Sequence, residues 1–450
     1  MLAPFRGLRY APDRVSGLAE VTSPPYDAIG PGSVPRLLAA DPHNVVRLIL
    51  PHADPAAGAD GYAVAAGTLN SWIDEGVLAA DPRPAIYVYE QSAAAPDHVL
   101  QRGLIGAVRL SPPGAGIVLP HEAVMPGPVT GRRELMEATQ ANLEPIFLLY
   151  DGSPAGIRPD GVTAGEGAGG ATRLVDEIAG TRDPLLAAVT EDGITHRLWA
   201  ITDPAEQAVV AADLTTRQAL IADGHHRYAA YLELQARRHA AGGQAGPWDY
   251  GLALLVDSAA YPPRIGAMHR VIPGLPPADA VALAKAAFTV RALPGDLPAA
   301  LRELAEAGQH SPAFLIAGGG ELHLADHPDP VQAAAAMPAA SSPAWRALPA
   351  SVLQQLLIGR LWRVPGGEQA VRVVHQDADA ALRAADEAGG TAVLCNPVPA
   401  GDVRDIAGRG ERMPPKSTSF GPKARTGLLI RTFGYGWPDR RYRLSGTPGP

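Results

Sequence analysis

The sequence predicts a mixed α/β (α+β) protein in which short apolar strands alternate with amphipathic helices. Runs rich in β-branched and aromatic residues, AIYVYE at 85–90 and GLIGAVRL at 103–110, predict strands. Helical spacing over 62–73 ends at a Glu-Gly pair, which is typical of a helix C-terminus. With 450 residues, 46% hydrophobic and 19% charged, the chain is globular and too long for one core.

The first third predicts a strand at 45–50 (VVRLIL), a helix at 62–73, strands at 85–90 and 103–110, a helix at 132–142 and a strand at 145–150. A Gly/Ala/Pro-rich stretch at 151–170 then predicts an exposed loop or linker. We therefore expect an N-terminal α/β region at 1–150.

The middle region predicts strands at 196–202, 219–222 and 251–257 and helices at 204–212 and 227–240. The last third predicts helices at 277–287 and 352–362, strands at 313–316, 371–374, 392–394 and 427–432, and a loop with one weak helical stretch at 328–343. These patterns favour two further regions, 171–275 and 276–450.

Charge, cysteine content and hydropathy argue against several classes of protein. The net charge is −8, and no run of lysine or arginine provides the basic face with which proteins bind nucleic acid. Cys395 is the only cysteine, so no intrachain disulfide forms. The first residues form no apolar leader, and no 18-residue apolar run predicts a membrane span. We expect a cytoplasmic protein that binds small molecules; the sequence does not indicate its oligomeric state.

The segment DGHHR at 223–227 carries the strongest functional signal, because it follows a buried strand and opens a helix. Gly224 permits a tight turn, and the amides of a helix start favour an anion. Arg227 offers a bidentate donor for phosphate oxygens, and His225 and His226 can donate hydrogen bonds or move protons. Asp223 caps the helix or binds a hydroxyl or a metal ion. The alternative is a plain N-cap followed by surface histidines.

Two further segments carry candidate site residues. Glu122 is a candidate general base or Mg²⁺ ligand supported by His121; alternatively, this loop is solvated and Glu122 pairs with Arg132 or Arg133. The prolines of SPPYD at 23–27 stiffen the chain and orient Tyr26 and Asp27, unless the segment is only a rigid turn.

Four more residues could join a site. His43 and Asn44 flank the strand predicted at 45–50 and could line the same cleft as Tyr26 and Asp27. Arg270 could form a second phosphate clamp or a structural ion pair. Lys416, in a polar loop at 412–420, could contact an anionic ligand or lie on an ordered surface loop.

Common metal and nucleophile motifs do not occur in the sequence: it contains no HExxH, CxxC, GxxxxGK[ST] or GxSxG. A zinc site would need ligands from distant loops, such as His121, Glu122 and His269. Cys395 lies in an apolar strand and is a poor candidate nucleophile.

The motifs PPYD at 24–27, HNVVRL at 43–48, PHE at 120–122, GRREL with ATQAN at 131–142, DGHHRY at 223–228 and MPPKSTSF at 413–420 resemble domain-of-unknown-function family 1015. The resemblance spans nearly the whole chain and implies no particular activity.

The shorter segment GHHRYAA at 224–230 resembles the phosphate-binding box of the ParB/sulfiredoxin-like superfamily, which includes CTP-binding partition proteins, ATP-using sulfiredoxins and free-serine kinases. This resemblance implies a ParB/sulfiredoxin-like core in which Gly224 and Arg227 form the phosphate turn. His226 matches the sulfiredoxin histidine. His225 replaces the sulfiredoxin cysteine, which argues against sulfinic-acid reduction.

Together these features lead to the hypothesis of a nucleotide-dependent, kinase-like phosphotransferase acting on a small hydroxyl metabolite. The expected ligand is ATP, ADP or CTP with Mg²⁺, bound by Asp223 to Arg227 with Arg270 and Lys416, while Glu122, His121 and His226 act in catalysis. The alternatives are a non-catalytic ParB-like regulatory module that binds nucleotide and a metal-dependent hydrolase.

Overall fold

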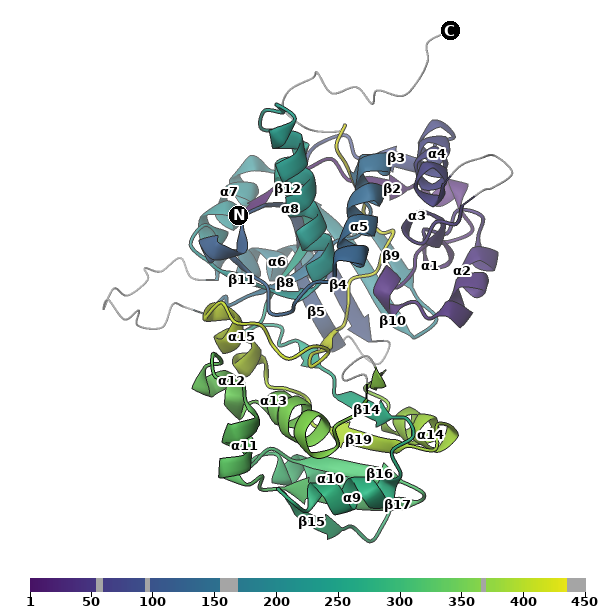
Figure 1. The fold of residues 1–450 in the computed structure, drawn as a ribbon. Helices are drawn as coiled ribbons and strands as arrows, with labels where there is room; N and C mark the ends of the chain where they lie inside the picture. Colours follow the sequence, from purple (N-terminus) through teal and green to yellow (C-terminus); the bar gives the residue numbers. More distant parts are fainter. Residues whose placement is uncertain (54–59, 94–97, 154–168, 366–369, 435–450) are drawn as a thin grey trace. The chain divides into compact units, whose positions relative to one another are not determined.

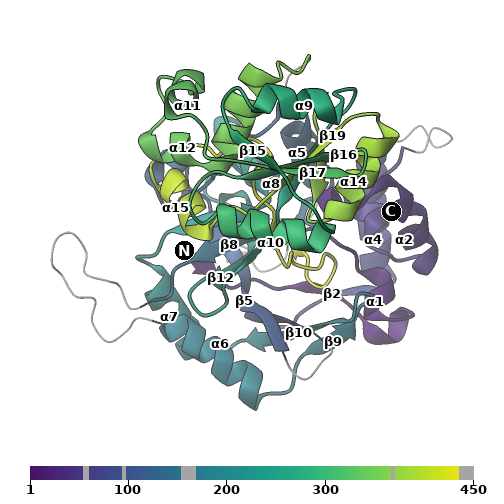
Figure 2. The same cartoon turned by 90° about the horizontal axis from the view of Figure 1, so that it is seen from below.

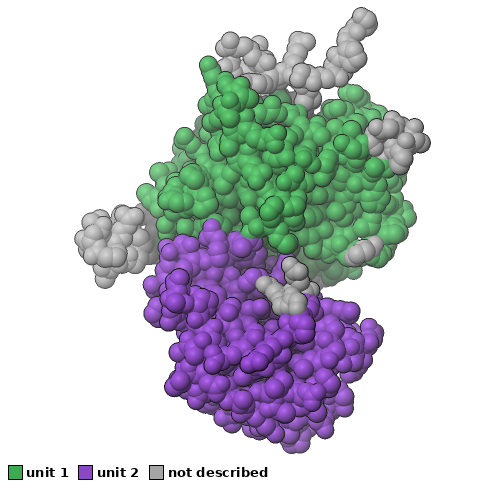
Figure 3. All heavy atoms as spheres, in the orientation of Figure 1, with its two compact units in different colours: residues 1–120, 124–263, 422–450 green, residues 121–123, 264–421 purple. Residues whose placement is uncertain are grey.

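The computed structural model describes residues 1–53, 60–93, 98–153, 169–365 and 370–434. The chain divides into two compact units, each described by itself below (Figure 3). Unit 1 comprises residues 1–120, 124–263 and 422–450, and unit 2 comprises residues 121–123 and 264–421. The boundary expected at 151–170 falls within unit 1, and most of that stretch lies outside the described residues. The three ranges expected from the sequence therefore stay a prediction about folding regions.

Unit 1 is built on a mixed β-sheet of nine strands in the described part of the chain (Figure 1). In spatial order these are β6 (Val118–Leu119), β11 (Ala219–Asp223), β8 (Ile146–Tyr150), β12 (Tyr250–Asp257), β5 (His98–Arg109), β4 (Ile86–Ala93), β10 (Ile194–Ile201) and β9 (Leu186–Val189), with β1 (Leu2–Ala3) also paired to β5. The pairs β11–β6 and β12–β8 are parallel, and the others are antiparallel.

Four long helices pack on this sheet because each presents an apolar stripe. They are α5 (Pro126–Thr139), α6 (Gly170–Thr181), α7 (Pro204–Leu214) and α8 (His225–Ala240). Helices α6 and α7 lie side by side (Figure 2), whereas α8 packs against α5 and contacts β8 and β12. Side chains from all four helices share one core with the central strands.

The N-terminal part of unit 1 forms a second core. It contains α1 (Leu18–Val21), α2 (Val34–Ala40), α3 (Val46–Ile49) and α4 (Gly61–Asp74), with the strand pairs β2 (Leu8–Tyr10) with β3 (Leu78–Ala80) and β7 (Ala141–Asn142) with β21 (Arg431–Thr432). Leu135 from α5 and Ile430 close this core. Chain segments from both ends of the sequence therefore contribute to one apolar cluster.

In the part of unit 2 that the structure describes, six strands form an antiparallel sheet with helices on both faces. Its strands, in spatial order, are β15 (Thr289–Ala292), β17 (Glu321–Asp326), β16 (Phe314–Gly318), β19 (Thr391–Cys395), β14 (Met268–Ile272) and β18 (Arg372–His375). Its helices are α9 (Pro277–Ala284), α10 (Leu297–Ala307), α11 (Pro330–Ala336), α12 (Pro343–Ala347), α13 (Pro349–Ser351), the π-helix η6 (Val352–Leu361), α14 (Ala378–Glu387) and α15 (Ala400–Gly408). The pair β13 (Arg264–Ile265) with β20 (Phe420–Gly421) joins the two ends of the unit.

Strand β16 shows how the two faces of this sheet are filled. Successive side chains of a strand point to opposite faces. Phe314 and Ile316 pack with α9 and η6, whereas Leu315 and Ala317 pack with α10 and α14. Unit 2 therefore has two apolar layers of its own.

Most elements predicted from periodicity are confirmed, one predicted strand is wrong, and another is shorter than predicted. VVRLIL at 45–50 is not a strand, because its residues Val46–Ile49 form helix α3. The Asn44 side chain accepts a hydrogen bond from the Val46 amide at 2.9 Å, which favours the helical turn. The strand predicted at 427–432 is reduced to Arg431–Thr432. Within the described residues, no helix combines the length and the apolar character needed to span a bilayer.

Candidate functional site

The turn between β11 and α8 has the geometry expected for DGHHR. Strand β11 ends at Asp223, Gly224 adopts φ +94°, and α8 begins at His225. Gly224, rather than Asp223, holds the N-cap position. A Cβ at Gly224 would lie 2.9 Å from Ile146 Cγ2, so only glycine fits without strain. The first amides of α8 have no acceptor within the helix and favour negative charge. The strand, tight turn and helix start predicted here are confirmed, and the capping role of Asp223 is wrong.

Arg227 is buried beneath this turn, with 4% of its surface exposed. Its Nη1 donates to the Pro145 carbonyl at 2.7 Å, and its Nη2 donates to Asp223 Oδ2 at 2.5 Å. Its Nε is buried and has no hydrogen-bond partner among the described residues. Burial by itself lowers the pKa of Arg227, but Glu144, Asp223 and Asp27 outweigh it and raise the pKa. The guanidinium is therefore charged and is held against protein groups.

Lys423 forms ion pairs with two aspartates from separate motifs, Asp27 of SPPYD and Asp223 of DGHHR. Its Nζ lies 2.5 Å from Asp223 Oδ1 and 3.2 Å from Asp27 Oδ1. Burial raises the pKa of Asp27, yet Arg227 and Lys423 outweigh it, so the net pKa is lowered. Burial likewise lowers the pKa of Lys423, but the two aspartates reverse this and raise it. The side chains of Lys423 and Asp27 are therefore charged at neutral pH, and Lys423 retains 27% side-chain exposure.

Tyr26 and Arg132 extend the site from the other side. The Arg132 guanidinium carbon lies 4.2 Å from the centroid of the Tyr26 ring, which is a cation–π geometry. The Arg227 guanidinium carbon lies 5.8 Å from the same ring. The Tyr26 amide donates to Glu144 Oε1 at 2.9 Å. SPPYD thus meets DGHHR in unit 1, through Tyr26 and through Asp27.

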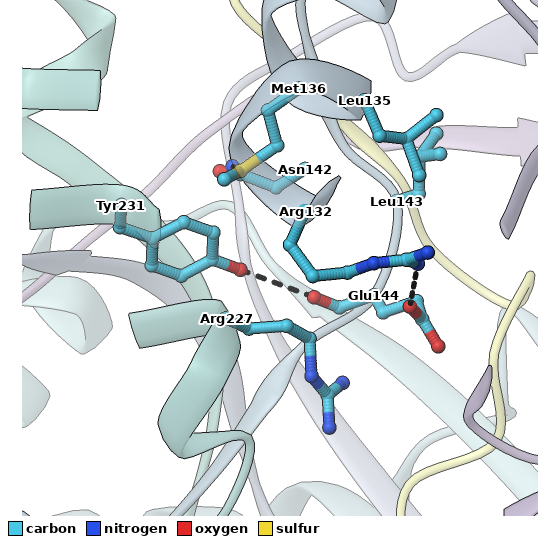
Figure 4. A pocket seen from close by; sticks show the side chains of 8 residues that line it. All are labelled: Arg132, Leu135, Met136, Asn142, Leu143, Glu144, Arg227 and Tyr231. Atoms are coloured by element: carbon cyan, nitrogen blue, oxygen red, sulfur yellow. Dashed lines mark hydrogen bonds and ion pairs between the residues drawn. The ribbon is translucent and has the colours of Figure 1, made fainter. Parts of the chain in front are cut away.

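Glu144 faces a small cavity beside Arg227 (Figure 4). The cavity measures about 20 Å³, and it is lined by Arg132, Leu135, Met136, Asn142, Leu143, Glu144, Arg227 and Tyr231. This volume holds about one water molecule. Burial raises the pKa of Glu144 and outweighs the opposing charges of Arg227 and Arg132. The pKa of Glu144 is therefore raised, whereas that of Asp27 is lowered.

A chain segment from 422 to 426 presents Lys423 to the two aspartates. Two buried glutamines on neighbouring strands hold its backbone: Gln91 Nε2 donates to the Lys423 carbonyl at 3.1 Å, and Gln101 Nε2 donates to the Pro422 carbonyl at 3.2 Å. Thr426 pairs with Ser23 through backbone hydrogen bonds of 2.9 and 3.1 Å. The segment is therefore fixed both to the sheet and to SPPYD.

The two histidines of DGHHR have different surroundings. His225 is buried, with 6% of its surface exposed. His226 is half-buried, and its Nε2 accepts a hydrogen bond from the Met125 amide at 3.1 Å. Nε2 of a neutral His226 is therefore unprotonated, which places the proton on Nδ1.

His121 and Glu122 belong to unit 2, where they meet the loop that contains Lys416. Thr418 Oγ1 donates to Glu122 Oε1 at 3.0 Å and therefore accepts from His121 Nε2 at 2.9 Å. The pair His121–Glu122 is separated by 4.0 Å between Nε2 and Oε1. Two segments that were predicted separately thus form one polar cluster. The catalytic and Mg²⁺ roles of Glu122 remain predictions.

Arg270 and Lys416 also lie in unit 2. Arg270 is 5% exposed and donates to the backbone carbonyls of Met268 at 3.0 Å and Lys416 at 2.8 Å. Lys416 adopts a left-handed φ of 53° and has an exposed side chain. Their phosphate-binding roles remain predictions.

His43 and Asn44 have local partners in the N-terminal core of unit 1. His43 Nδ1 lies 3.2 Å from Asp41 Oδ1, and its ring packs edge-on against Trp72. Asn44 is fully buried and donates to the Glu20 carbonyl at 2.6 Å. Contacts of this kind stabilise the fold. A role of these two residues in a cleft beside SPPYD stays a prediction.

Sequence reasoning missed Lys423, Glu144, Gln91 and Gln101. Glu144 lies two residues beyond the helix predicted at 132–142, and Lys423 lies beyond the loop in which Lys416 was chosen. The available signal was the short GPKAR segment at 421–425, which contains one of the few lysines of the chain.

Comparison with known proteins identifies a family without a described activity. Residues 2–351 match the model described as "Protein of unknown function (DUF1015)". No curated protein matches the chain significantly.

Solved structures give only distant likenesses. A variant of free serine kinase in complex with ADP has 13% identity and a TM-score of 0.33, over 68% of this chain and 84% of that chain. C-terminally truncated SbnI from Staphylococcus aureus has 11% identity and a TM-score of 0.35, over 73% of this chain and 87% of that chain. A conserved hypothetical protein from Pyrococcus furiosus has 12% identity and a TM-score of 0.32, over 68% and 87%. Likenesses at these TM-scores carry no conclusion about the function of this chain.

Proposed function

The chain belongs to the DUF1015 family of proteins of unknown function, and on that premise we propose that unit 1 is a nucleotide-dependent phosphotransferase. It binds the phosphate groups of a nucleotide at the start of α8 and transfers a phosphoryl group to the hydroxyl of a small metabolite. In this proposal the segment 224–230 is the ParB/sulfiredoxin-like phosphate-binding box suggested by its residues.

The observation that carries the proposal is the left-handed Gly224 between β11 and α8. This left-handed turn leads the chain directly from β11 into α8, whose first amides favour an anion. The positive end of the helix dipole adds to the charges of Arg227 and Lys423. Phosphoryl transfer depends mainly on such fixed positive charge and on positioning of the reactants.

The carboxylates of Asp27 and Asp223 fit the Mg²⁺ that accompanies nucleotide phosphates. Both pair with Lys423, and Mg²⁺ prefers carboxylate oxygens together with those of the phosphates. When bound, Mg²⁺ would neutralise phosphate charge. The protein's own groups keep the guanidinium of Arg227 and the ammonium of Lys423 beside the turn.

Thermal unfolding with ATP, ADP, CTP and GTP, each with and without Mg²⁺, tests the binding step. A nucleotide present at a hundred times its Kd should add about 2.7 kcal/mol to the free energy of unfolding. Adenosine without phosphates is the matched control and should add little. If no nucleotide stabilises the protein, the proposal is wrong.

Nucleotide consumption across a panel of hydroxyl amino acids and sugars tests the transfer step. A phosphotransferase should release ADP only when the correct acceptor is present, with one phosphorylated product for each ADP. Tight nucleotide binding without turnover on any acceptor would instead favour the non-catalytic regulatory module.

A further inference from the structure

We propose that Lys423 is the side chain that contacts the phosphates of the ligand, and that Arg227 is a positioning residue. This inference rests on the proposed function and names the cation that recognises the anion at that site. The ligand class is a nucleoside di- or triphosphate, which Lys423 contacts through its phosphate oxygens.

Arg227 and Lys423 differ in their exposure to solvent, and this difference indicates different roles. Arg227 is 4% exposed, and both of its terminal nitrogens are bonded to protein oxygens. This burial keeps a phosphate in solvent from reaching the guanidinium. Arg227 instead ties Asp223 to the Pro145 carbonyl, and so fixes the end of β11 directly before Gly224. Arg227 therefore acts on the ligand through the shape of the turn.

Lys423, in contrast to Arg227, is partly exposed to solvent. Its side chain is 27% exposed, so an anion from solvent can reach it. The cavity beside Arg227, at about 20 Å³, is far too small for a nucleotide, which leaves the exposed side of the site for the ligand. The ammonium has three donors, and Asp223 and Asp27 use two of them. The third can bind a phosphate oxygen.

The two carboxylates hold Lys423 unequally. Its contact with Asp223 is 2.5 Å, whereas its contact with Asp27 is 3.2 Å. A phosphate oxygen takes the third donor of the ammonium, and the close contact with Asp223 keeps Lys423 next to the helix start.

The backbone around Lys423 is fixed by buried amides. Gln101 donates to both the Pro422 carbonyl and Gln91 Oε1, and Gln91 donates to the Lys423 carbonyl. Both glutamines are at most 3% exposed. Arg425 Nε, two residues further along, donates to the Thr22 hydroxyl oxygen at 3.0 Å. A buried network whose hydrogen bonds are all satisfied holds the backbone on either side of Lys423 in one conformation.

Lysine acylation followed by mass spectrometry tests the inference on the unmodified protein. The chain has three lysines, at positions 285, 416 and 423, so each is read separately. We expect pyrophosphate and ATP to slow acylation of Lys423 at least about tenfold, and adenosine to have no effect, because a bound phosphate covers the ammonium. Lys285 is exposed at the end of α9 and provides the internal control. Lys416, the lysine favoured by the sequence, is measured in the same spectra.

Variants at the same position give an independent measurement. Lys423→Gln should weaken ADP binding about 10- to 100-fold, as expected for loss of a hydrogen bond from a charged group. Lys423→Arg keeps the charge and should retain affinity to within a few fold. Lys285→Gln should bind as the wild type does. Thermal unfolding without ligand shows whether each variant is folded.

The outcomes separate this inference from the proposed function. Nucleotide binding by the wild type with unprotected Lys423, or with full affinity in Lys423→Gln, overturns the inference and leaves the proposed function intact. Protection of Lys423 by pyrophosphate without turnover on any acceptor supports the inference and contradicts the phosphotransferase. Absence of binding by pyrophosphate and by every nucleotide overturns both.

Discussion

At the scale of single residues, burial assigns different roles to groups of similar charge. Arg227 and Lys423 both pair with Asp223, but only Lys423 reaches solvent. Glu144 and Asp223 are both carboxyl groups near Arg227, yet Glu144 is buried and its ion pair with Arg132 spans 3.9 Å. The same site therefore holds a positioning cation, an exposed cation and a carboxyl group whose pKa is raised by burial.

Glu144 should make the stability of the protein depend on pH. Its pKa in the folded protein is raised by burial above the unfolded value of about 4.3. The folded state binds this proton more tightly, so the contribution of Glu144 is fully present below about pH 4.3. That contribution is lost as the pH rises through the folded pKa, by about 1.4 kcal/mol for each pH unit that separates the folded pKa from the unfolded pKa.

The variant Glu144→Gln isolates this effect, because the amide oxygen can still accept from the Tyr26 amide. Denaturant unfolding from pH 4 to pH 8 should show that the variant gains stability relative to the wild type as the pH rises. Glu387→Gln, at an exposed position on α14, should follow the wild type at every pH. Parallel curves for wild type and Glu144→Gln would contradict the raised pKa.

At the scale of elements, a glycine-to-alanine substitution tests whether the turn from β11 to α8 needs its left-handed glycine. Gly224→Ala should lower the free energy of unfolding by about 1–3 kcal/mol, because alanine is strained at φ +94° and its Cβ would meet Ile146. Gly67→Ala is the matched control within α4, where an added Cβ meets nothing within 4 Å. It should raise the free energy of unfolding by about 0.5–1 kcal/mol.

Chemical denaturation of the two variants measures these opposite changes. Equal effects of the two substitutions, or a stable Gly224→Ala protein, would show that the turn does not need its left-handed glycine. Pyrophosphate binding by Gly224→Ala should also be weakened, because relief of the backbone strain at φ +94° would shift the first amides of α8.

The sequence could predict elements from their periodicity or from their residue types. The helical spacing at 62–73 became α4 because that periodicity reflects burial on one face, and AIYVYE became β4 because its β-branched and aromatic residues favour a strand. VVRLIL misled because a short apolar run fits a buried strand or a buried helical turn equally well. The side chain of Asn44 decides between them through its bond to the Val46 amide, which no propensity describes.

In the candidate site, too, the residues of a local motif could be predicted, whereas those placed by long-range contacts could not. DGHHR combined a strand end, a glycine and a helix start within five residues, so local chemistry was enough to locate it. Lys423 is 200 residues from Asp223, and its place depends on Gln91, Gln101 and Ser23. Those are contacts between distant segments, and no periodicity in the sequence around Lys423 indicates them. The sequence prediction named Lys416, which lies in a local polar loop, and its phosphate-binding role stays a prediction.

At the scale of the whole molecule, the chain leaves unit 1 after residue 263 and returns at residue 422. The returning segment carries Lys423, so the site in unit 1 is complete only after unit 2 has been traversed. Unit 2 fills both faces of its own sheet with apolar side chains. We therefore expect a ligand at the start of α8 to stabilise unit 1 directly and to leave the core of unit 2 unchanged.

Hydrogen exchange with and without pyrophosphate measures this difference. The relevant amides are those of β11, α8 and the 422–426 segment that exchange only after the ligand has dissociated. A ligand at a hundred times its Kd should slow hydrogen exchange at these amides roughly 100-fold. Amides of β16 and β19 serve as the comparison within the same chain, since they lie in the sheet of unit 2. A ligand bound only by unit 1 can slow only those unfolding events that release it. Equal slowing of hydrogen exchange in β16 and β19 would therefore mean that the two units unfold together.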